Sequence, residues 1–187
     1  MRCPTLTVAA ACAVIAIVSQ FSPASANTGS APWTRRPFPR RVPSAAALAV
    51  CGAKMVGFLN GDRARNHVAP LLVEDPRLDA IALRHSQDMV SRNYFSHATP
   101  GAGSVFDALG KMHVSFVGAG ENIAENTYLT VSRLGQSLAR TNGDLMHSRG
   151  HRANILALAF TKVGVGVAVD RKTNTMIVTE VFVQTSR

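Results

Sequence analysis

Cysteine is scarce in this sequence, with three among 187 residues. Two of them, Cys3 and Cys12, lie in a leader that we expect to be removed, which leaves Cys51 alone in the exported chain. A single cysteine cannot form an internal disulfide, so the class of small disulfide-stabilised domains is excluded. Stability must then come from a packed core, which a chain of this length can bury. Cys51 lies in the apolar run 45–56, and we expect a buried, inert thiol rather than a reactive or intermolecular one.

A long membrane-spanning run is also missing. An almost unbroken apolar stretch covers residues 6–18, but it is too short for a comfortable transmembrane helix. Arg2 precedes this stretch and Ala24-Ser25-Ala26 follows it, so residues 1–26 are predicted to be a secretory signal peptide. The alternative is a lipoprotein acylated at Cys12, which would truncate the apolar stretch. We therefore expect a secreted protein that is extracellular or associated with the cell envelope.

Acidic residues are few, 11 against 20 lysines and arginines, and the formal net charge is +9. Residues 27–43 contain no acidic residue, four prolines and the cations Arg35, Arg36, Arg40 and Arg41. This composition predicts an extended basic arm without a core. The arm is either a solvated linker or an electrostatic contact to an anionic envelope, wall polymer or membrane surface. Basic residues are not interleaved with aromatic ones, which argues against nucleic acid as a partner.

Several enzyme motifs are absent as well. The sequence has no His-Glu-x-x-His helix, so the best-known zinc protease arrangement is excluded. It has no nucleophile-elbow motif around a serine, no phosphate-binding glycine loop and no dinucleotide fingerprint. Any chemistry must therefore come from residues that are brought together by the fold.

Helices are predicted mainly in the first half of the chain. Ser44 has the character of an N-cap for a helix over residues 45–65. Asp75 followed by Pro76 marks the start of a second helix, because the pair combines a cap residue with proline in the first turn. A third long helix is expected over residues 130–146.

Strands are predicted later in the chain. Residues 114–124 mix apolar residues with glycines, which predicts a strand interrupted by a turn at Gly120. The β-branched runs 163–169 and 176–184 predict a C-terminal hairpin. No repeat and no second linker divide residues 44–187, so one domain is expected. Early helices and late strands favour an α+β domain with helices on the faces of an antiparallel sheet.

One carboxylate and two histidines stand out in turn-rich contexts: Glu121 beside Asn122, His97 behind two aromatic residues, and His151 three residues after Ser148. Each has an ordinary structural explanation, such as a histidine bonded to a backbone carbonyl, a glutamate at a surface turn or a histidine capping a helix. Together they are the residue types needed for acid–base chemistry or for a metal site with open positions. Their sequence spacing alone does not bring them together.

His85 has a different pattern. It recurs at helical spacing with Ile81 and Met89, so it lies on the apolar face of the second helix. We expect it to be a core or pocket-wall histidine whose polar atoms are satisfied. The remaining three histidines have no convincing partners and are expected at the surface.

A series of motifs runs along the domain in order: Leu59-Asn60 with Arg63; Pro70-Leu71; Asp75-Pro76 with Leu78; His85-Ser86 with Asp88-Met89; Tyr94-Phe95-Ser96-His97; Gly120-Glu121-Asn122-Ile123-Ala124; Ser148, Gly150-His151-Arg152 and Asn154-Ile155-Leu156; and Val163-Gly164-Val165-Gly166. In type, number and order, these motifs resemble those of bacterial CAP (SCP) domains. That superfamily includes the cysteine-rich secretory proteins, antigen 5 and the plant pathogenesis-related proteins. The resemblance covers residues 56–184, nearly the whole predicted domain.

The resemblance implies a three-layer α-β-α sandwich with a central antiparallel sheet. It also implies a cleft lined by two histidines and acidic residues, which correspond here to His97, His151 and Glu121, with Asn122 and Ser148 beside them. Some members of the superfamily bind zinc or another divalent cation through the two histidines. Some bind sterols or fatty acids, and proteolysis has been proposed for a few.

The sequence departs from the family pattern at three positions. Eukaryotic relatives often carry a second glutamate on the helix before the last histidine motif, where this chain has Ser148. Glu121 is therefore expected to be the only carboxylate of the cleft. Bacterial members often have tryptophan near Leu145 and proline near Arg149, so the cleft wall is expected to differ and to carry a charge beside His151.

These observations favour a secreted binding domain over an enzyme. Its cleft would hold Zn²⁺ or another divalent cation through His97 and His151, with Glu121 orienting a water or ligand. A lipid, a sterol-like molecule or a cell-wall component is the expected ligand. The alternative is a metal-assisted hydrolase, a protease or cell-wall hydrolase, with Glu121 as general base. A third, weaker interpretation is a structural or antigenic surface protein with a vestigial cleft.

Overall fold

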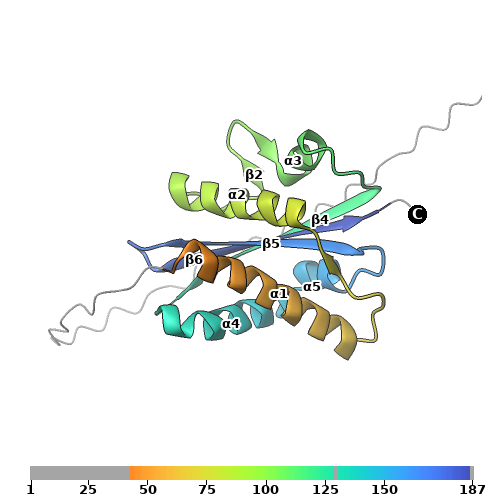
Figure 1. The fold of residues 1–187 in the computed structure, drawn as a ribbon, viewed down its shortest axis with the longest axis horizontal. Coiled ribbons are helices and arrows are strands. Elements are labelled where there is room, and N and C mark those ends of the chain that lie inside the picture. The colour runs from red at the N-terminus through yellow and green to blue at the C-terminus, as the bar shows by residue number, and fades with distance from the viewer. Residues whose placement is uncertain (1–42, 129, 186–187) are drawn as a thin grey trace, which may run out of the picture.

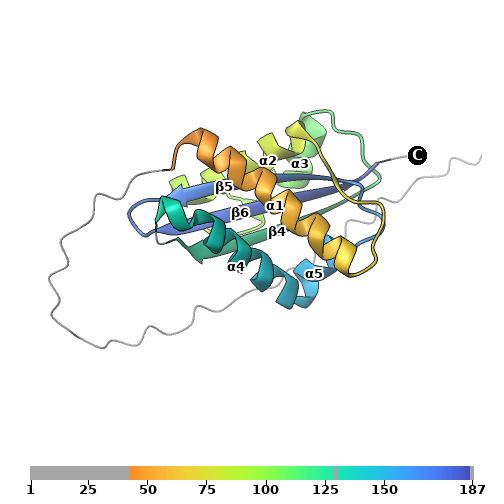
Figure 2. The ribbon, with the colours of Figure 1, turned by 60° about the horizontal axis from the view of Figure 1, so that its bottom comes forward.

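A computed structural model describes residues 43–128 and 130–185. The predicted signal peptide, the four arginines of the arm, Cys3 and Cys12 lie outside the described residues. The described part forms three layers, with one sheet between two layers of helices (Figure 1). Helices α2 and α3 lie on one face of the sheet, and α1, α4 and α5 lie on the other, as Figure 2 shows from below. This is the α-β-α sandwich expected from the sequence.

The first two long helices begin where the sequence predicts. Helix α1 (Ala45–Arg65) is capped by Ser44, whose hydroxyl accepts the Ala47 N–H at 3.1 Å. Helix α2 (Pro76–Arg92) is capped by Asp75, whose carboxylate accepts the Arg77 N–H at 3.0 Å. The side chain of Arg77, with a contribution from Lys162, holds the pKa of Asp75 well below its usual range. The cap therefore stays ionised, and can accept these bonds, in all but strongly acidic solution.

Three shorter helices complete the two helical layers. Helix α3 (Val105–Lys111) starts with a local bond from the Ser104 N–H to Asp107 at 2.7 Å. The predicted helix 130–146 begins instead with a 3₁₀ turn, Val131–Arg133, before α4 (Leu134–His147). Helix α5 (Arg149–Ile155) follows directly. None of the described helices is both long and apolar enough to cross a membrane.

The main sheet has the strand order β1-β5-β6-β4. Its three long strands, β4 (Gly118–Thr127), β5 (Lys162–Asp170) and β6 (Thr175–Gln184), are antiparallel, and β5 with β6 forms the predicted hairpin. The short edge strand β1 (Val73–Glu74) pairs parallel to β5, which makes the sheet mixed. A separate two-stranded ribbon joins β2 (Ala98–Thr99) to β3 (Gly103–Ser104).

The predicted turn at Gly120 is wrong, because β4 continues through this residue. A Cβ at Gly120 would lie 2.9 Å from the ring of Phe160 and 3.1 Å from Asn154 Oδ1. The glycine is therefore required by close packing across the strand rather than by a bend. Since the strand is unbroken, Glu121 and Asn122 point to opposite faces of the sheet.

Helix α2 rests directly on strand β5. A Cβ at Gly164 would meet the backbone of Leu78 and Asp79, and a Cβ at Gly166 would meet the backbone of Ala82 and Leu83. The two glycines thus let the helix backbone touch the sheet without intervening side chains. Ser86 adds a bond to the Gly166 carbonyl at 3.1 Å. This close contact fixes the position of α2 on the sheet and therefore the position of His85.

In the helical layer that contains α1 and α5, one buried arginine joins α1 to other segments of the chain. Arg63 on α1 is fully buried, and its guanidinium donates to the carbonyls of four residues that lie beyond the helix: Pro70, Ile155, Ala157 and Phe160. The fan-shaped guanidinium suits such multiple acceptors. Cys51, also on α1, is buried as predicted, and burial raises the pKa of its thiol, which disfavours the reactive thiolate.

Candidate functional site

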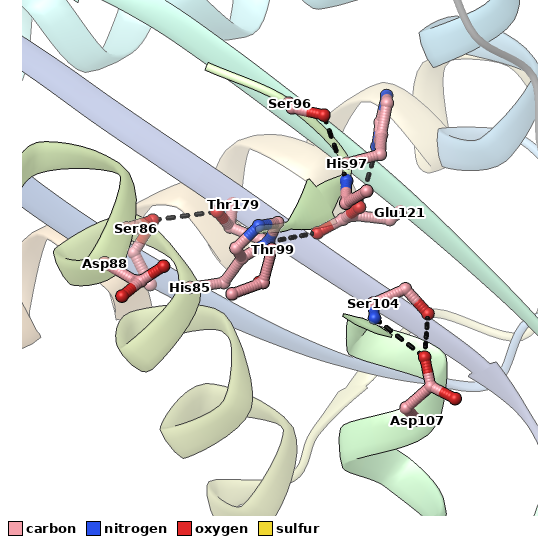
Figure 3. A network of polar contacts seen from close by, with 12 residues as sticks. His85, Ser86, Asp88, Ser96, His97, Thr99, Ser104, Asp107, Glu121 and Thr179 are labelled. Atoms are coloured by element: carbon pink, nitrogen blue, oxygen red, sulfur yellow. Dashed lines mark hydrogen bonds and ion pairs between the residues drawn. The ribbon is translucent and has the colours of Figure 1, made fainter. Parts of the chain in front are cut away.

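Glu121 lies on β4 and points toward α2, where two imidazole rings hold its carboxylate (Figure 3). Its Oε1 is 2.7 Å from Nδ1 of His85, and its Oε2 is 2.7 Å from Nδ1 of His97. The exposed fraction of the side chain is 2% for Glu121, 3% for His85 and 27% for His97. A buried histidine from α2 and a partly exposed one from the following segment therefore share one carboxylate.

The chemistry of the carboxylate fixes the orientation of both rings. An ionised carboxylate only accepts hydrogen bonds, so each Nδ1 must carry a hydrogen and donate it. Nε2 is then the ring atom that remains for other partners in both histidines. In His97 this atom points away from Glu121 (Figure 3). In His85 it is buried and has no hydrogen-bond partner among the described residues.

The prediction that His85 is buried is confirmed. The prediction that all of its polar atoms have hydrogen-bond partners is wrong. The helical period placed this histidine on the buried face of α2, which the structure confirms. It did not reveal the bond to Glu121, 36 residues away, because no local pattern encodes that contact. A histidine among apolar residues at helical spacing was nevertheless the signal that pointed to this position.

His97 is carried by the segment between α2 and α3. The Tyr94 hydroxyl donates to Asp88 Oδ2 at 2.6 Å, which ties the start of the segment back to α2. The Ser96 hydroxyl accepts the Ala98 N–H at 3.1 Å, and the β2–β3 ribbon follows. These contacts present the ring to Glu121 from the side of the sheet on which α2 lies.

His151 lies on α5, on the other side of the sheet from α2. The residue is buried, and its backbone carbonyl accepts the side-chain amide of Asn122 at 3.2 Å. Its ring makes no hydrogen bond within residues 43–128 and 130–185. Burial, and to a smaller extent the proximity of His97, lower the pKa of His151. The neutral imidazole, which is the metal-binding form, is thereby favoured.

Asn122 belongs to a second buried network on the α4 and α5 side of the sheet. Its amide donates to Glu180 Oε2 at 2.9 Å, and its carbonyl oxygen accepts Asn154 Nδ2 at 2.9 Å. Asn154 also donates to the backbone carbonyl of Glu121 at 3.2 Å. Asn122 therefore secures the strand that carries Glu121, while its own side chain faces away from the His85–His97 pair.

Glu180 is a carboxylate that was not predicted for this region. It is fully buried on β6, directly opposite Asn122, and burial raises its pKa to about 7. Its only visible sequence signal is a charged residue at an inward position of an apolar, β-branched strand. Because Glu180 faces the α1 and α4 core, Glu121 is still the carboxylate beside His85 and His97. Ser148 sits half-buried between α4 and α5 and makes no side-chain hydrogen bond to the described residues.

A divalent cation would have a restricted set of protein ligands here. No three His, Cys, Asp or Glu side chains of the described residues are gathered around one metal position. His97 nevertheless has the feature typical of a metal-ligating histidine: one ring nitrogen bonded to a carboxylate and the other free. Two histidines are too few for a closed structural site, so a cation held by His97 and His151 would take its remaining ligands from water or from a bound molecule.

Comparison with known sequences identifies the family. Residues 56–185 match CAP, the Cysteine-rich secretory protein family. The chain belongs to this family, as its motifs indicated.

Two curated relatives come from Bacillus subtilis (strain 168). The uncharacterized protein YkwD is 34% identical over 144 residues, covering 76% of this chain and 52% of YkwD. The uncharacterized membrane protein YlbC is 39% identical over 119 residues, covering 64% of this chain and 31% of YlbC. The chain thus spans about half of one relative and a third of the other.

Solved structures show the same architecture. An extracellular protein containing a SCP domain from Bacillus anthracis str. Ames is 33% identical, with a TM-score of 0.59, covering 73% of this chain and 41% of that protein. An outer surface protein of Borrelia burgdorferi has a TM-score of 0.62 at 15% identity, covering 76% of this chain and 95% of that protein. The second similarity concerns the fold alone.

Proposed function

We propose that this CAP domain is a secreted or envelope-associated binding module whose cleft is formed around His97, Glu121 and His151. The observation that carries the proposal is the burial of Glu121 between two histidines. Both of its carboxylate oxygens are bonded to histidines at 2.7 Å, and its side chain is 2% exposed. A carboxylate held in this way serves to orient rings. A general base needs an oxygen that a water can reach, and the burial of Glu121 argues against such access and therefore against the hydrolase alternative.

The cleft suits a divalent cation such as Zn²⁺. His97 would contribute the Nε2 that Glu121 leaves free, and His151 would contribute its neutral ring. A bound cation would supply a Lewis-acidic centre whose remaining positions take oxygen atoms of a ligand or water. Glu121 would act through His97, by fixing its ring and raising its basicity. A lipid, sterol-like or cell-wall ligand with such oxygens fits this proposal.

The location is inferred from the leader and from the relatives. The apolar stretch and cleavage signal of residues 1–26 predict export. One similar structure is described as extracellular and another as an outer surface protein, which supports the same location. The cations Arg35, Arg36, Arg40 and Arg41 would then contact an anionic envelope surface.

Calorimetric titration with zinc tests the cation site. The wild-type chain should bind, and the double variant His97→Ala/His151→Ala should lose at least about tenfold in affinity. The matched control is His67→Asn/His113→Asn, because both of these residues are exposed, both have positive φ, and asparagine tolerates that conformation. Equal affinity in the wild type and the cleft variant would refute the cation site.

A separate assay tests the hydrolase. Purified protein is incubated with peptide and cell-wall substrates, with and without chelator, beside the Glu121→Gln variant. We expect no turnover above background in any arm. Turnover that disappears both with chelator and with Glu121→Gln would overturn the binding proposal in favour of metal-assisted hydrolysis.

A further inference from the structure

Two connecting segments of the domain are unusually apolar, although loops are normally rich in polar and turn-forming residues. The segment that joins α1 to β1 contains an unbroken apolar run, 68–73, and the segment that leads from the end of α5 to β5 contains another, 155–160. Leu72, Ile155 and Phe160 are buried, and the other residues of both runs are half-buried or exposed. Apolar runs that face water are typical of an interaction surface.

The two runs lie side by side because Arg63 holds both of them. Its guanidinium donates to the Pro70 carbonyl at 2.8 Å and to the Ala157 carbonyl at 2.9 Å. Both runs therefore occupy one end of the sandwich, the right-hand end in Figures 1 and 2. The residues that follow these two carbonyls are exposed, Leu71 by 50% and Leu158 by 67%.

We call the exposed residues of the two runs the apolar tip, which consists of Ala69, Pro70, Leu71, Val73, Leu158 and Ala159.

The backbone behind the apolar tip is already hydrogen-bonded to the protein. Asn60 on α1 accepts the Leu72 N–H at 2.8 Å and donates to the Leu72 carbonyl at 3.0 Å. Arg63 occupies the carbonyl of Pro70, a residue that has no N–H of its own. Backbone groups that are paired in this way lose little when their surroundings become apolar. The tip is therefore suited to leave water without unfolding.

Two arginines flank the apolar tip on the side of α1 and α5. Arg65 is in the last turn of α1, its side chain is 68% exposed, and it pairs with Asp62 at 2.6 Å. Arg152 on α5 is exposed and donates to Asn66 Oδ1 at 2.7 Å, which places it where the first run begins. Glu74, after the end of that run, adds one exposed carboxylate. Exposed apolar side chains beside cations are typical of proteins that bind the surface of an anionic membrane.

We propose that the apolar tip docks on an anionic lipid bilayer. Leu71 and Leu158 enter the boundary between headgroups and acyl chains, and Arg65 and Arg152 contact the lipid phosphates. A bilayer needs no complementary groove, so it accepts projecting side chains directly. The docking rests on the envelope location proposed above, and it concerns the outside of the bilayer rather than a lipid bound in the cleft.

The apolar tip is a different surface from the basic arm. Helix α1 has 21 residues and is therefore about 30 Å long. The arm precedes the first residue of this helix, whereas the tip lies beyond its last residue. The two contacts are therefore separable by substitution.

Vesicle binding tests the apolar part of the tip. Residues 27–187 are titrated with vesicles of phosphatidylcholine alone and of an equimolar mixture with phosphatidylglycerol, and the mixture should bind more tightly. Leu71→Ser/Leu158→Ser should weaken binding to the mixture at least about tenfold, because each leucine contributes at least about that factor when buried. The matched control is Val50→Ser/Leu83→Ser, at two exposed apolar positions on α1 and α2. Equal weakening in both double variants would refute the tip.

A second pair of variants tests the cations. Arg65→Gln/Arg152→Gln should weaken binding to the mixed vesicles by about tenfold or more, at about fivefold for each arginine. Binding to phosphatidylcholine alone should change little. The control Arg140→Gln/Arg171→Gln removes the same charge at two other exposed positions. If both pairs weaken binding equally, the vesicles respond only to net charge, and the placement of the two arginines is wrong.

Replacing the four arginines of the arm by glutamine separates the tip from the arm. This variant should still bind the mixed vesicles, and adding Leu71→Ser/Leu158→Ser should abolish the binding that remains. If the arm variant fails to bind while the tip variant binds like the wild type, the bilayer contact belongs to the arm alone and the proposal is wrong. The zinc titration of the cleft uses no vesicles, so the two proposals fail independently.

Fluorescence tests insertion directly, because Trp33 is the only tryptophan of the sequence. In Trp33→Phe/Leu158→Trp, mixed vesicles should shift the emission to shorter wavelength, and brominated lipid should quench it. The control Trp33→Phe/Val50→Trp should show neither effect. The same response in both variants would contradict insertion at the tip. Self-association that depends on Leu71 and Leu158, without any response to vesicles, would instead make the tip a contact between copies of the chain and overturn the proposal.

Discussion

Glu121 and Glu180 are two buried glutamates on adjacent strands of one sheet, but they face opposite layers. Glu121 faces α2 and gives both oxygens to histidines, one of which reaches solvent. Glu180 faces the α1 and α4 core, accepts one bond from Asn122, and leaves its Oε1 without a partner among the described residues. The difference shows that burial alone does not define a functional carboxylate. Glu121 differs from Glu180 because two imidazole rings donate to it, and one of them, His97, is partly exposed at the surface.

The largest expected effect comes from separating α2 from the sheet. In Gly166→Ala, the added Cβ would meet the α2 backbone, so we expect a loss of about 3 kcal/mol in the free energy of unfolding. The contact between His85 and Glu121 should weaken with it, while the Glu180 face keeps its packing. Denaturant unfolding measures the change. The control Gly143→Ala, a helical position with open space, should be neutral or stabilising by up to about 1 kcal/mol.

The next largest effect is the pH dependence that Glu180 gives to the free energy of unfolding. Burial raises its pKa to about 7 from the usual 4.5, so the folded chain holds this proton more tightly than the unfolded chain. The stabilisation is fully present below pH 4.5 and is lost as the pH rises through about 7. Between about pH 5 and pH 8, the wild type should lose about 2–3 kcal/mol from this group.

Glu180→Gln mimics the protonated form, so it should remove this part of the pH dependence and be more stable than the wild type at about pH 8. Thermal or urea unfolding across this range measures the difference. The exposed Glu125 on β4 supplies the control, because Glu125→Gln should change stability by no more than about 0.5 kcal/mol. An unaltered pH dependence in Glu180→Gln would show that another group is responsible.

The smallest effect, and the sharpest contrast, comes from the same substitution at Glu121. A carboxamide offers one acceptor oxygen and one donor nitrogen, so one of the two histidine N–H groups loses its acceptor. Glu121→Gln should therefore lower the free energy of unfolding by about 2 kcal/mol at about pH 8, where Glu180→Gln raises it. Parallel urea titrations test the opposite signs. Equal signs would contradict the distinction drawn between the two carboxylates.

The sequence predicted local features well because their causes are local. Ser44 and Asp75 begin helices through bonds to residues two or three positions away. The C-terminal hairpin follows from two β-branched runs separated by a short turn. Gly120 misled the prediction because its cause is distant: the glycine makes room for Phe160 and Asn154, and its neighbours along the chain do not reveal this.

The candidate site was predicted in part for the same reason. His97, Glu121 and His151 stand out by context and by the family resemblance, and the structure brings His97 to Glu121 directly. The bond between His85 and Glu121 depends on how α2 sits on β5, which a single sequence does not specify. Glu180 was not predicted, because its register opposite Asn122 decides its environment and a single sequence does not specify that register.

The direct contact of α2 with Gly164 and Gly166 limits how the helix can move on the sheet. A helix whose backbone touches the sheet has no layer of side chains over which to slide, so His85 keeps its position when a ligand arrives. Adjustment falls to the segment 93–104, which is tied to α2 by few side chains and contains two glycines with positive φ. That segment carries His97, whose ring is bonded to Glu121. A change in its backbone would therefore move the partly exposed ring of the pair, while His85 stays in place.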